Sequence, residues 1–224
     1  MSNAVLIRAV VPMKPAYQGK SRLAEVLDAE GRAALSLHLL QHVLQSLSGA
    51  STSVEMVVIG GDEWVRDVAV ETGAQWQQEP GGGLNGAIRY AVDAAFAAAA
   101  AAVLVAPGDL GLLAPKDVDD LIALSSGLRR VVLARAASDG GTNAILAPRG
   151  MMVGPYFGRG SFLRHLEAAR DSGAPVEVSQ SPGFAFDLDT PQDMAAYRSA
   201  CPDMDTTLAA WRQRLLFKAR AATG

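Results

Sequence analysis

Cysteine is nearly absent from this sequence: Cys201 is the only one in 224 residues. A disulfide framework within one chain is therefore excluded, and a reducing, cytoplasmic setting is expected. Cys201 has neither a histidine neighbour nor a basic helix start, the features that activate a thiol. We interpret it as a buried or incidental side chain.

Charged residues are also scarce, at 19% of the chain, and the formal net charge is −3. No long run of lysine and arginine occurs, which argues against nucleic acid as a partner. Half of the residues are hydrophobic, a composition typical of a globular protein. A chain of this length can build one good core, and one domain of about 200 residues is expected.

Long hydrophobic runs are missing as well. Residues 5–11 are apolar, but Arg8 interrupts them and they are too few to cross a bilayer. The alanine-rich segment 91–106 contains Asp93 and is typical of a helix that runs into a strand. Residues 1–4 lack the basic region of a signal peptide. The sequence therefore predicts no membrane partner and no secretory leader.

The sequence alternates short apolar runs, rich in valine and isoleucine, with segments of helical periodicity. This alternation predicts a single three-layer α/β domain with a mainly parallel, mixed sheet and helices on both faces. We expect the domain over 1–200, with an amphipathic helix in 201–224 as an appendage or oligomer contact. The apolar side of this helix would carry Trp211, Leu215 and Leu216. Strands are expected at 4–13, 54–59, 74–78, 103–107, 130–135, 144–147, 175–178 and 184–186, and helices at 28–48, 62–72, 85–101, 115–125, 161–172, 192–200 and 205–219.

Three aspartates follow expected strands. Asp109 comes after one strand, and Asp187 and Asp189 come after another, just before Thr190 and Pro191, which can cap and begin a helix. Ligands of open α/β sheets bind outside the carboxyl ends of the strands. Acids from two strand ends, without cysteine or histidine nearby, indicate a hard cation, above all magnesium. The alternative is that these aspartates are loop caps and turn residues.

A basic loop follows the first expected strand and carries Lys14, Lys20 and Arg22. Gly19-Lys20-Ser21 is similar to the end of a P-loop, but Lys14 replaces the glycine required five positions earlier, so a P-loop ATPase is rejected. Three cations at the end of a strand can neutralise a triphosphate. An ordinary solvated loop is the alternative.

Glycines occur at three further turns. Gly81, Gly82 and Gly83 precede Asn85 at an expected helix start, where backbone N–H groups can bind an anion and Asn85 can recognise a base or sugar, or act only as an N-cap. The turns 140–143 and 157–161 are similar, and Ser161 is either part of a second anion site or only a helix cap.

His38 and His42 lie four residues apart on one expected helix and could both bind zinc. No third ligand follows them, so a packed or solvated helix face is the better interpretation.

Together these segments resemble the phospholactate and phosphoenolpyruvate guanylyltransferases, which act in the biosynthesis of the deazaflavin coenzyme. The resemblance covers nearly the whole chain up to about Arg198. It implies a nucleotidyltransferase fold of the glycosyltransferase-A-like type. The segments that carry it are Val-Pro-Met-Lys at 11–14, Lys-Ser-Arg-Leu at 20–23, Gly-Leu-Asn at 83–85, Asp109, Gly-Gly-Thr-Asn at 140–143, Phe-Gly-x-Gly-Ser at 157–161 and Asp-Leu-Asp-Thr-Pro at 187–191.

The resemblance implies transfer of GMP from GTP to the phosphate of phosphoenolpyruvate, 2-phospholactate or 3-phosphoglycerate, with release of pyrophosphate. A downstream transferase that takes the product, and a second copy of the chain, are candidate partners. The implied catalytic residues are Lys14, Lys20 and Asp109. The implied magnesium ligands are Asp109, Asp187 and Asp189; the nucleotide would lie against Lys14, Lys20, Arg22, Gly83 and Asn85, and the phosphorylated acid against Thr142, Gly158 and Ser161.

The chain departs from the family around its first acid. The family usually has Pro-Ala-Asp-Leu-Pro there, whereas this chain has Pro-Gly-Asp-Leu-Gly at 107–111, which predicts a looser turn beside Asp109. Two alternatives therefore stay open. One is a nucleotidyltransferase with another base, or with a sugar-phosphate or molybdopterin acceptor; the other is a nucleotide-binding module without turnover.

Overall fold

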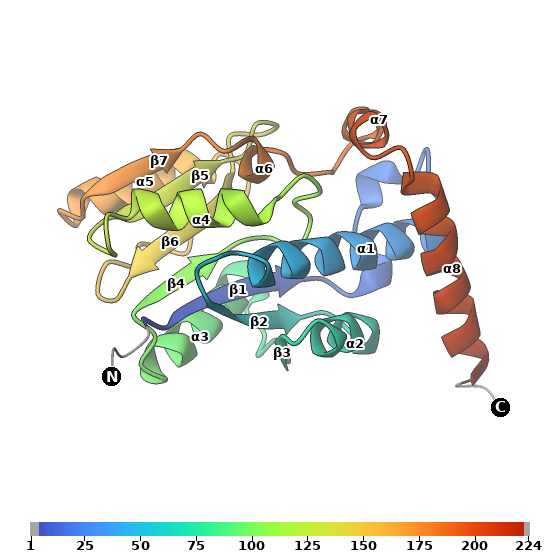
Figure 1. Ribbon diagram of the computed structural model, residues 1–224, viewed down its shortest axis with the longest axis horizontal. Coiled ribbons are helices and arrows are strands. Elements are labelled where there is room, and N and C mark those ends of the chain that lie inside the picture. The colour runs from blue at the N-terminus through green and yellow to red at the C-terminus, as the bar shows by residue number, and fades with distance from the viewer. Residues whose placement is uncertain (1–4, 222–224) are drawn as a thin grey trace.

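The computed structural model describes residues 5–221, and its strands form a single seven-stranded sheet (Figure 1). The strand order is β3-β2-β1-β4-β6-β5-β7. Strand β6 is antiparallel to both of its neighbours, and the other strand pairs are parallel, which confirms the mainly parallel mixed sheet. The strands are β1 (Ile7–Met13), β2 (Val54–Gly60), β3 (Gln75–Gln77), β4 (Ala102–Val105), β5 (Val131–Arg135), β6 (Thr142–Pro148) and β7 (Val176–Ser179).

Helices cover both faces of this sheet (Figure 1). Alternate side chains of a strand point to opposite faces, so in β1 Val11 packs with the core of α1 while Val10 packs with α3. The expected three-layer architecture is confirmed. The helices are α1 (Ala29–Ser48), α2 (Glu63–Glu71), α3 (Gly83–Ala97), α4 (Pro115–Leu124), α5 (Ser161–Asp171), α6 (Pro182–Ala185), α7 (Pro191–Ala200) and α8 (Met204–Ala221), with short 3₁₀ turns η1 (Ala16–Gln18) and η2 (Ser21–Leu23).

Several helix starts follow the expected capping chemistry. The Asp28 carboxylate accepts a hydrogen bond from the Gly31 N–H at 2.8 Å. At the start of α7, Thr190 and Asp193 cap each other's backbone N–H groups, ahead of Pro191 at the first helical position. This reciprocal cap fixes the direction in which the chain leaves the acidic segment.

Several element boundaries differ from expectation, and two of the larger differences concern α3 and β6. Helix α3 ends at Ala97 and not at 101, because Ala99 has a left-handed φ of 64° and the Ala100 N–H bonds back to the Ala95 carbonyl. Strand β6 begins at Thr142, which was expected in a turn. Thr142 is therefore held rigidly in the sheet.

The expected strand at 184–186 is wrong. Its place is taken by the one-turn helix α6, which begins after Ser181. The Ser181 side chain accepts a hydrogen bond from the Phe184 N–H and so caps this turn. Asp187 and Asp189 therefore follow a helical turn and not a strand end. The segment that carries them is joined to the turn at Asp109 by a hydrogen bond from the Leu188 N–H to the Asp109 carbonyl, with an N···O distance of 3.4 Å.

Helix α8 packs along α1 and contributes Leu208, Trp211 and Leu215 to the core of that face. Leu216, expected on the apolar side, is 53% exposed, so that part of the expectation is wrong. No helix within residues 5–221 is both long and apolar enough to cross a membrane. Ala4, the expected first residue of the first strand, lies outside the described residues.

Candidate active site

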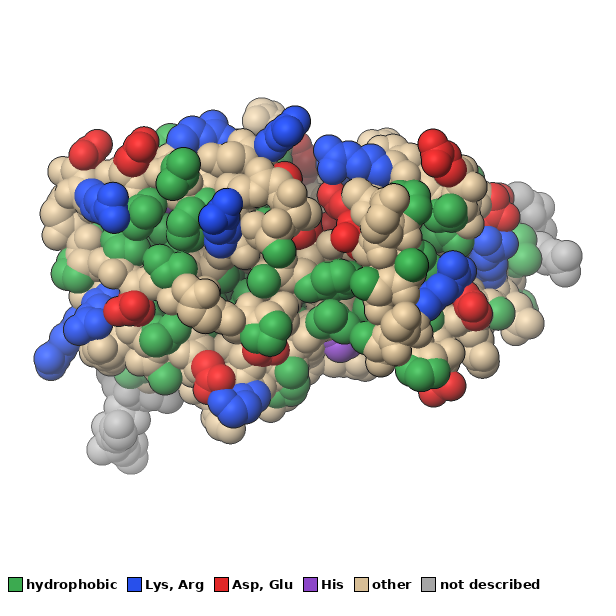
Figure 2. Space-filling model, turned by 90° about the horizontal axis from the view of Figure 1, so that it is seen from above, with side chains coloured by type: hydrophobic (Ala, Val, Ile, Leu, Met, Phe, Trp, Pro, Cys, Tyr) green, Lys and Arg blue, Asp and Glu red, His purple; other side chains and the backbone are tan. Residues whose placement is uncertain are grey.

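Two cavities meet at the carboxyl ends of β1 and β4, and Asp109 lines both of them. The larger cavity measures about 430 Å³, and the smaller one about 150 Å³. Viewed from above, acidic side chains lie in a hollow near the middle of the molecule, with lysine and arginine side chains on either side (Figure 2). The site therefore lies where ligands of open α/β sheets are expected.

The predicted site residues divide between the cavities. Three of them, Arg22, Asn85 and Ser161, line neither cavity. Lining the larger cavity are Lys14, Lys20, Gly83, Asp109 and Asp189; lining the smaller one are Asp109, Thr142, Gly158 and Asp187.

Lys20 lies between two of the aspartates. Its Nζ is 2.6 Å from Asp109 Oδ2 and 3.0 Å from Asp189 Oδ1, and its side chain is only 6% exposed. Burial alone would lower the pKa of Lys20, but the Asp109 and Asp189 carboxylates raise it above its ordinary value. Lys20 also has a left-handed φ of 55°, a strained conformation for a residue with a side chain. The lysine is thus a buried, fully charged partner of both acids.

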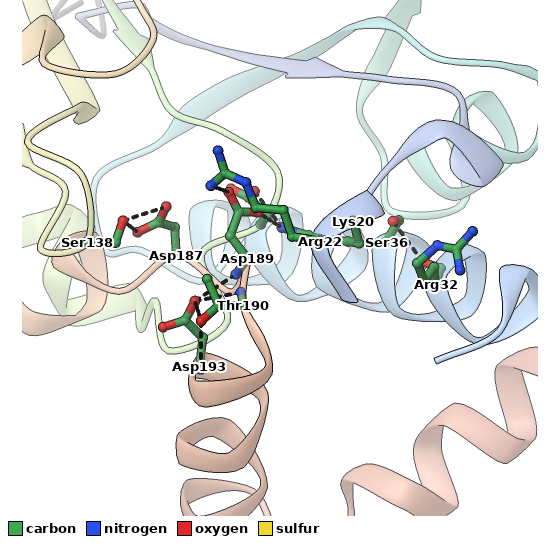
Figure 3. Close-up of polar contacts among 10 residues, drawn as sticks. Lys20, Arg22, Arg32, Ser36, Ser138, Asp187, Asp189, Thr190 and Asp193 are labelled. Atoms are coloured by element: carbon green, nitrogen blue, oxygen red, sulfur yellow. Dashed lines mark hydrogen bonds and ion pairs between the residues drawn. The ribbon is translucent and has the colours of Figure 1, made fainter. Parts of the chain in front are cut away.

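Asp187 points away from this lysine. It accepts hydrogen bonds from Ser138 Oγ at 3.1 and 3.3 Å, as Figure 3 shows. Burial, and then the charge of Asp109, raise the pKa of the Asp187 carboxyl above its ordinary value. Asp109 Oδ1 is buried without a hydrogen-bond partner. A second cation between Asp109 and Asp187 would therefore relieve both the repulsion and the unpaired oxygen.

The residues present fit magnesium in part. Asp109 and Asp187 offer hard oxygen atoms that repel each other, which suits a divalent cation. Asp189 is already neutralised by Lys20, and Arg22 lies 3.7 Å from it. Among residues 5–221, no three acidic, histidine or cysteine side chains are grouped closely enough to hold a metal ion as they stand. The three-aspartate site remains a prediction.

Asn85 connects the two sides of the site. Its Oδ1 accepts from the Phe157 N–H at 2.8 Å, and its Nδ2 donates to the Phe157 carbonyl at 3.1 Å. Helix α3 begins at Gly83 after Gly82, so the interpretation of Asn85 as an N-cap is wrong. The oxygen and the nitrogen of the Asn85 side-chain amide thus both hold the loop that begins at Phe157. Contact between Asn85 and a nucleotide stays a prediction.

The smaller cavity has a polar wall on β6, and the start of α5 supports this wall from behind. Ser161 is the first residue of α5, where Gly160 occupies the N-cap position, so the interpretation of Ser161 as a helix cap is wrong. Its Oγ instead donates to Thr142 Oγ1 at 3.1 Å. The strand pairing skips Asn143, because Ala134 faces Ala144 and Arg135 faces Thr142. Such a bulge re-aims side chains beside a site.

The turn beside Asp109 is closely packed. A Cβ atom on Gly108 would lie 2.4 Å from Met13 Sδ, and one on Gly111 would lie 2.9 Å from Tyr197 Cε2. Both glycines are buried. The expectation of a looser turn is therefore wrong, since Met13 and Tyr197 occupy the space that larger side chains at these two positions would fill.

Among residues 5–221, no third candidate metal ligand is grouped with the two histidines of α1. His38 Nε2 lies 3.3 Å from the Tyr197 hydroxyl, and burial lowers the pKa of His38 to about 4. The side chain is packed between helices, as the better interpretation of the sequence predicted.

The predicted site omitted several residues that line the cavities or support them. Glu79 lines the larger cavity, and Asp139 and Asn143 line the smaller one. His165 is buried behind Thr142. Its spacing of four residues from Ser161 on the expected helix was the available signal, because residues four apart share a helix face.

The fold is that of a nucleotidyltransferase. The solved structure of a nucleotidyl transferase from Methanothermobacter matches it with a TM-score of 0.61 and 14% sequence identity, over 87% of this chain and 96% of that chain. At this identity the similarity shows the fold alone. It confirms the expected fold class.

The family follows from the sequence match. Residues 7–197 match the family described as "Guanylyl transferase CofC like", and the chain belongs to this family. A phosphoenolpyruvate guanylyltransferase of Rubrobacter xylanophilus is 40% identical over 189 residues, which are 84% of this chain and 91% of the relative. The resemblance stated from the sequence is confirmed.

Other relatives are named for different acceptors. A 3-phospho-D-glycerate guanylyltransferase of Phenylobacterium zucineum is 34% identical over 192 residues, which are 84% of this chain and 88% of the relative. A 2-phospho-L-lactate guanylyltransferase of Methanocaldococcus jannaschii is 27% identical over 195 residues, which are 87% of this chain and 83% of the relative. These names span the three acids that the resemblance implied.

Proposed function

We propose that this protein transfers GMP from GTP to the phosphate of a small three-carbon phosphorylated acid and releases pyrophosphate. The observation that carries the proposal is the shared wall of the two cavities, where Asp109 stands between a large and a small compartment and is paired with Lys20 of the larger one. The larger cavity suits a nucleotide and the smaller one a three-carbon acid. Pyrophosphate release that depends on both substrates tests the proposal.

The reaction needs no side-chain base. An acceptor phosphate oxygen, already ionised at neutral pH, forms a bond to the α-phosphorus of GTP, and the bond from that phosphorus to the bridging oxygen breaks. The electron pair leaves with pyrophosphate. Catalysis then depends on alignment and on charge neutralisation. Lys14 and Lys20, on the wall of the larger cavity, supply two of the cations.

Magnesium is proposed as the cofactor, held by Asp109 and Asp187 with Asp189 as the third candidate ligand. When bound, it would neutralise phosphate charge and orient the triphosphate. The unpaired Asp109 Oδ1 and the raised pKa of Asp187 support this assignment.

Guanine is proposed as the base because a carboxylate lines the larger cavity. Glu79 stands there with the apolar side chains of Pro12, Ile59 and Ala87, which suit the faces of a flat base. A carboxylate accepts hydrogen bonds, and guanine offers N1–H and an amino group side by side, whereas adenine offers a bare N1. Glu79 therefore favours GTP over ATP.

We expect Glu79→Gln to weaken the selection of guanine over xanthine, which has an oxo group in place of the guanine amino group. The glutamine amide can donate to the 2-oxo group of xanthine, which a carboxylate repels. The ratio of kcat/KM for GTP to that for XTP should fall by at least about tenfold. Steady-state kinetics with both nucleotides measure it, and Glu63→Gln on α2, which does not line the cavity, serves as the control. An unchanged ratio would contradict the role of Glu79.

The product is a phosphoric anhydride between GMP and the acid, an activated compound. We propose that a downstream transferase in deazaflavin coenzyme biosynthesis consumes it in the cytoplasm. The single cysteine supports the cytoplasmic setting, and the names of the relatives support the chemical identity of the product.

A further inference from the structure

His165 is a buried histidine with both ring nitrogens engaged behind the smaller cavity. It lies on α5 and its residue is 0% exposed. Its Nε2 is 2.9 Å from the Tyr156 backbone nitrogen, and its Nδ1 is 2.9 Å from Thr142 Oγ1. The rings of Tyr156 and Phe157 flank it, with centroids 5.5 and 5.1 Å away. The imidazole is therefore held in one orientation.

The partners of His165 decide which nitrogen carries the proton. A backbone N–H can only donate, so Nε2 must accept from Tyr156 and carry no proton. Burial lowers the pKa of His165 to about 4, so the ring is neutral at physiological pH. A neutral ring without a proton on Nε2 carries it on Nδ1. The Nδ1–H therefore donates to Thr142 Oγ1.

Thr142 consequently has only a donor left to offer. Its Oγ1 accepts from His165 Nδ1 and from Ser161 Oγ, which occupies both lone pairs. Thr142 is 5% exposed and lines the smaller cavity. No hydrogen bond from the Thr142 hydroxyl to a protein acceptor occurs among residues 5–221, so its hydrogen is left for a group in that cavity.

We infer that His165 is a positioning residue that obliges Thr142 to donate a hydrogen bond to the anionic acceptor substrate. The inference rests on the proposed function, because it assigns the smaller cavity to the phosphorylated acid. A carboxylate or phosphate oxygen can only accept, so a fixed donor discriminates in favour of such a group. Thr142 contacts the acid, and His165 acts through Thr142.

Kinetics in a double-mutant cycle test this coupling. Thr142→Val and His165→Phe should each raise the KM of the acceptor acid about tenfold, as the loss of a hydrogen bond to a charged group predicts. The KM of GTP should change less than about twofold, because the larger cavity is untouched. In the Thr142→Val background, His165→Phe should add nothing.

Two further variants separate positioning from folding. His165→Asn can place an amide N–H near the position of Nδ1, so it should recover much of the affinity for the acid. His42→Phe alters a half-buried histidine that lines neither cavity, and it should leave both KM values unchanged. If His165→Phe does not fold, His165→Asn and Thr142→Val complete the comparison. Equal effects on both substrates, or effects that multiply in the double variant, would overturn the inference.

A spectroscopic measurement is independent of turnover. In protein labelled with ¹⁵N-histidine, the His165 signal, identified by its loss in His165→Asn, should show a protonated Nδ1 and a bare Nε2. The opposite tautomer would overturn the inference even in an active enzyme. If the wild-type protein releases no pyrophosphate with any acid, the proposed function fails. Phosphoenolpyruvate binding by calorimetry to the wild type and Thr142→Val then decides the inference, which weaker binding to the variant supports and equal binding overturns.

Discussion

Asp187→Asn is expected to lower kcat at least about a hundredfold while leaving the protein folded and no less stable. The loss of activity follows from the removal of one electrostatic partner of the phosphates and their magnesium. The stability follows from the raised pKa of Asp187, which means that the native state prefers the neutral form. The Asp187 carboxyl therefore stabilises the native state fully at pH values below its pKa in the unfolded chain, about 3.9. This contribution is lost as pH rises through the pKa of Asp187 in the folded protein.

Asparagine imitates the neutral carboxyl and keeps an oxygen for Ser138. At pH 7 the free energy of unfolding in urea should therefore equal or exceed that of the wild type, a trade of stability for activity. Asp171→Asn, at the exposed end of α5, is the matched control and should change neither quantity. Near-normal turnover by Asp187→Asn would remove Asp187 from the metal site, and a clear loss of stability would contradict the electrostatic argument.

Lys20→Met is expected to impair both activity and stability. Its ammonium neutralises Asp109 and Asp189, so its removal leaves Asp109 without a charged partner and Asp189 with only the more distant Arg22. Breaking a fully buried ion pair costs roughly 3–5 kcal/mol, and we expect about 2 kcal/mol here, because the Asp109 and Asp189 side chains are 29% and 36% exposed. The value of kcat/KM should fall about a hundredfold or more.

Two further substitutions sharpen the Lys20 experiment. Adding Asp189→Asn to Lys20→Met should restore stability in part, because a carboxylate with only the distant Arg22 as partner disappears, but it should not restore activity. Lys116→Met removes a lysine whose partner is Asp120 and whose side chain is 80% exposed, so it should cost little. Equal effects of Lys20→Met and Lys116→Met would contradict the role of the buried cluster.

The pH dependence of stability gives Lys20 a separate signature. Because the pKa of Lys20 is raised in the folded protein, its ion pairs stabilise the fold fully below the ordinary lysine pKa of 10.5. This stabilisation is lost as pH rises through the pKa of Lys20 in the folded protein. The free energy of unfolding of the wild type should therefore fall at alkaline pH by more than that of Lys20→Met. Parallel curves would show that the ion pairs contribute nothing to folding.

Elements with strong local signals were predictable from the sequence. Caps at Asp28 and Thr190 set the starts of α1 and α7, and valine-rich runs set the central strands. The strand expected at 184–186 is a helical turn because Ser181 and Pro182 form a helix-start signal like that of Thr190 and Pro191. An apolar run as short as 184–186 has no decisive period, so the capping residues before it decide its structure.

The site was predictable only to the level of position. Strand ends placed Asp109 and the basic loop at one edge of the sheet, yet the insertion of Lys20 between Asp109 and Asp189 joins residues 89 and 169 positions apart. No local pattern encodes such a contact. The role of His165 likewise depends on the loop at Tyr156 and on the bulge in β6, which only the folded chain brings together.

Pyrophosphate release with magnesium and GTP, measured separately with phosphoenolpyruvate, 2-phospholactate and 3-phosphoglycerate, tests the central claim most directly. We predict release that requires GTP and one of these acids, with a clear preference among the three, and that is lost in Asp187→Asn. Binding of GTP without release with any acid would contradict the proposed transfer and favour a nucleotide-binding module. Release with a sugar phosphate in place of the acids would instead identify a nucleotidyltransferase with another acceptor.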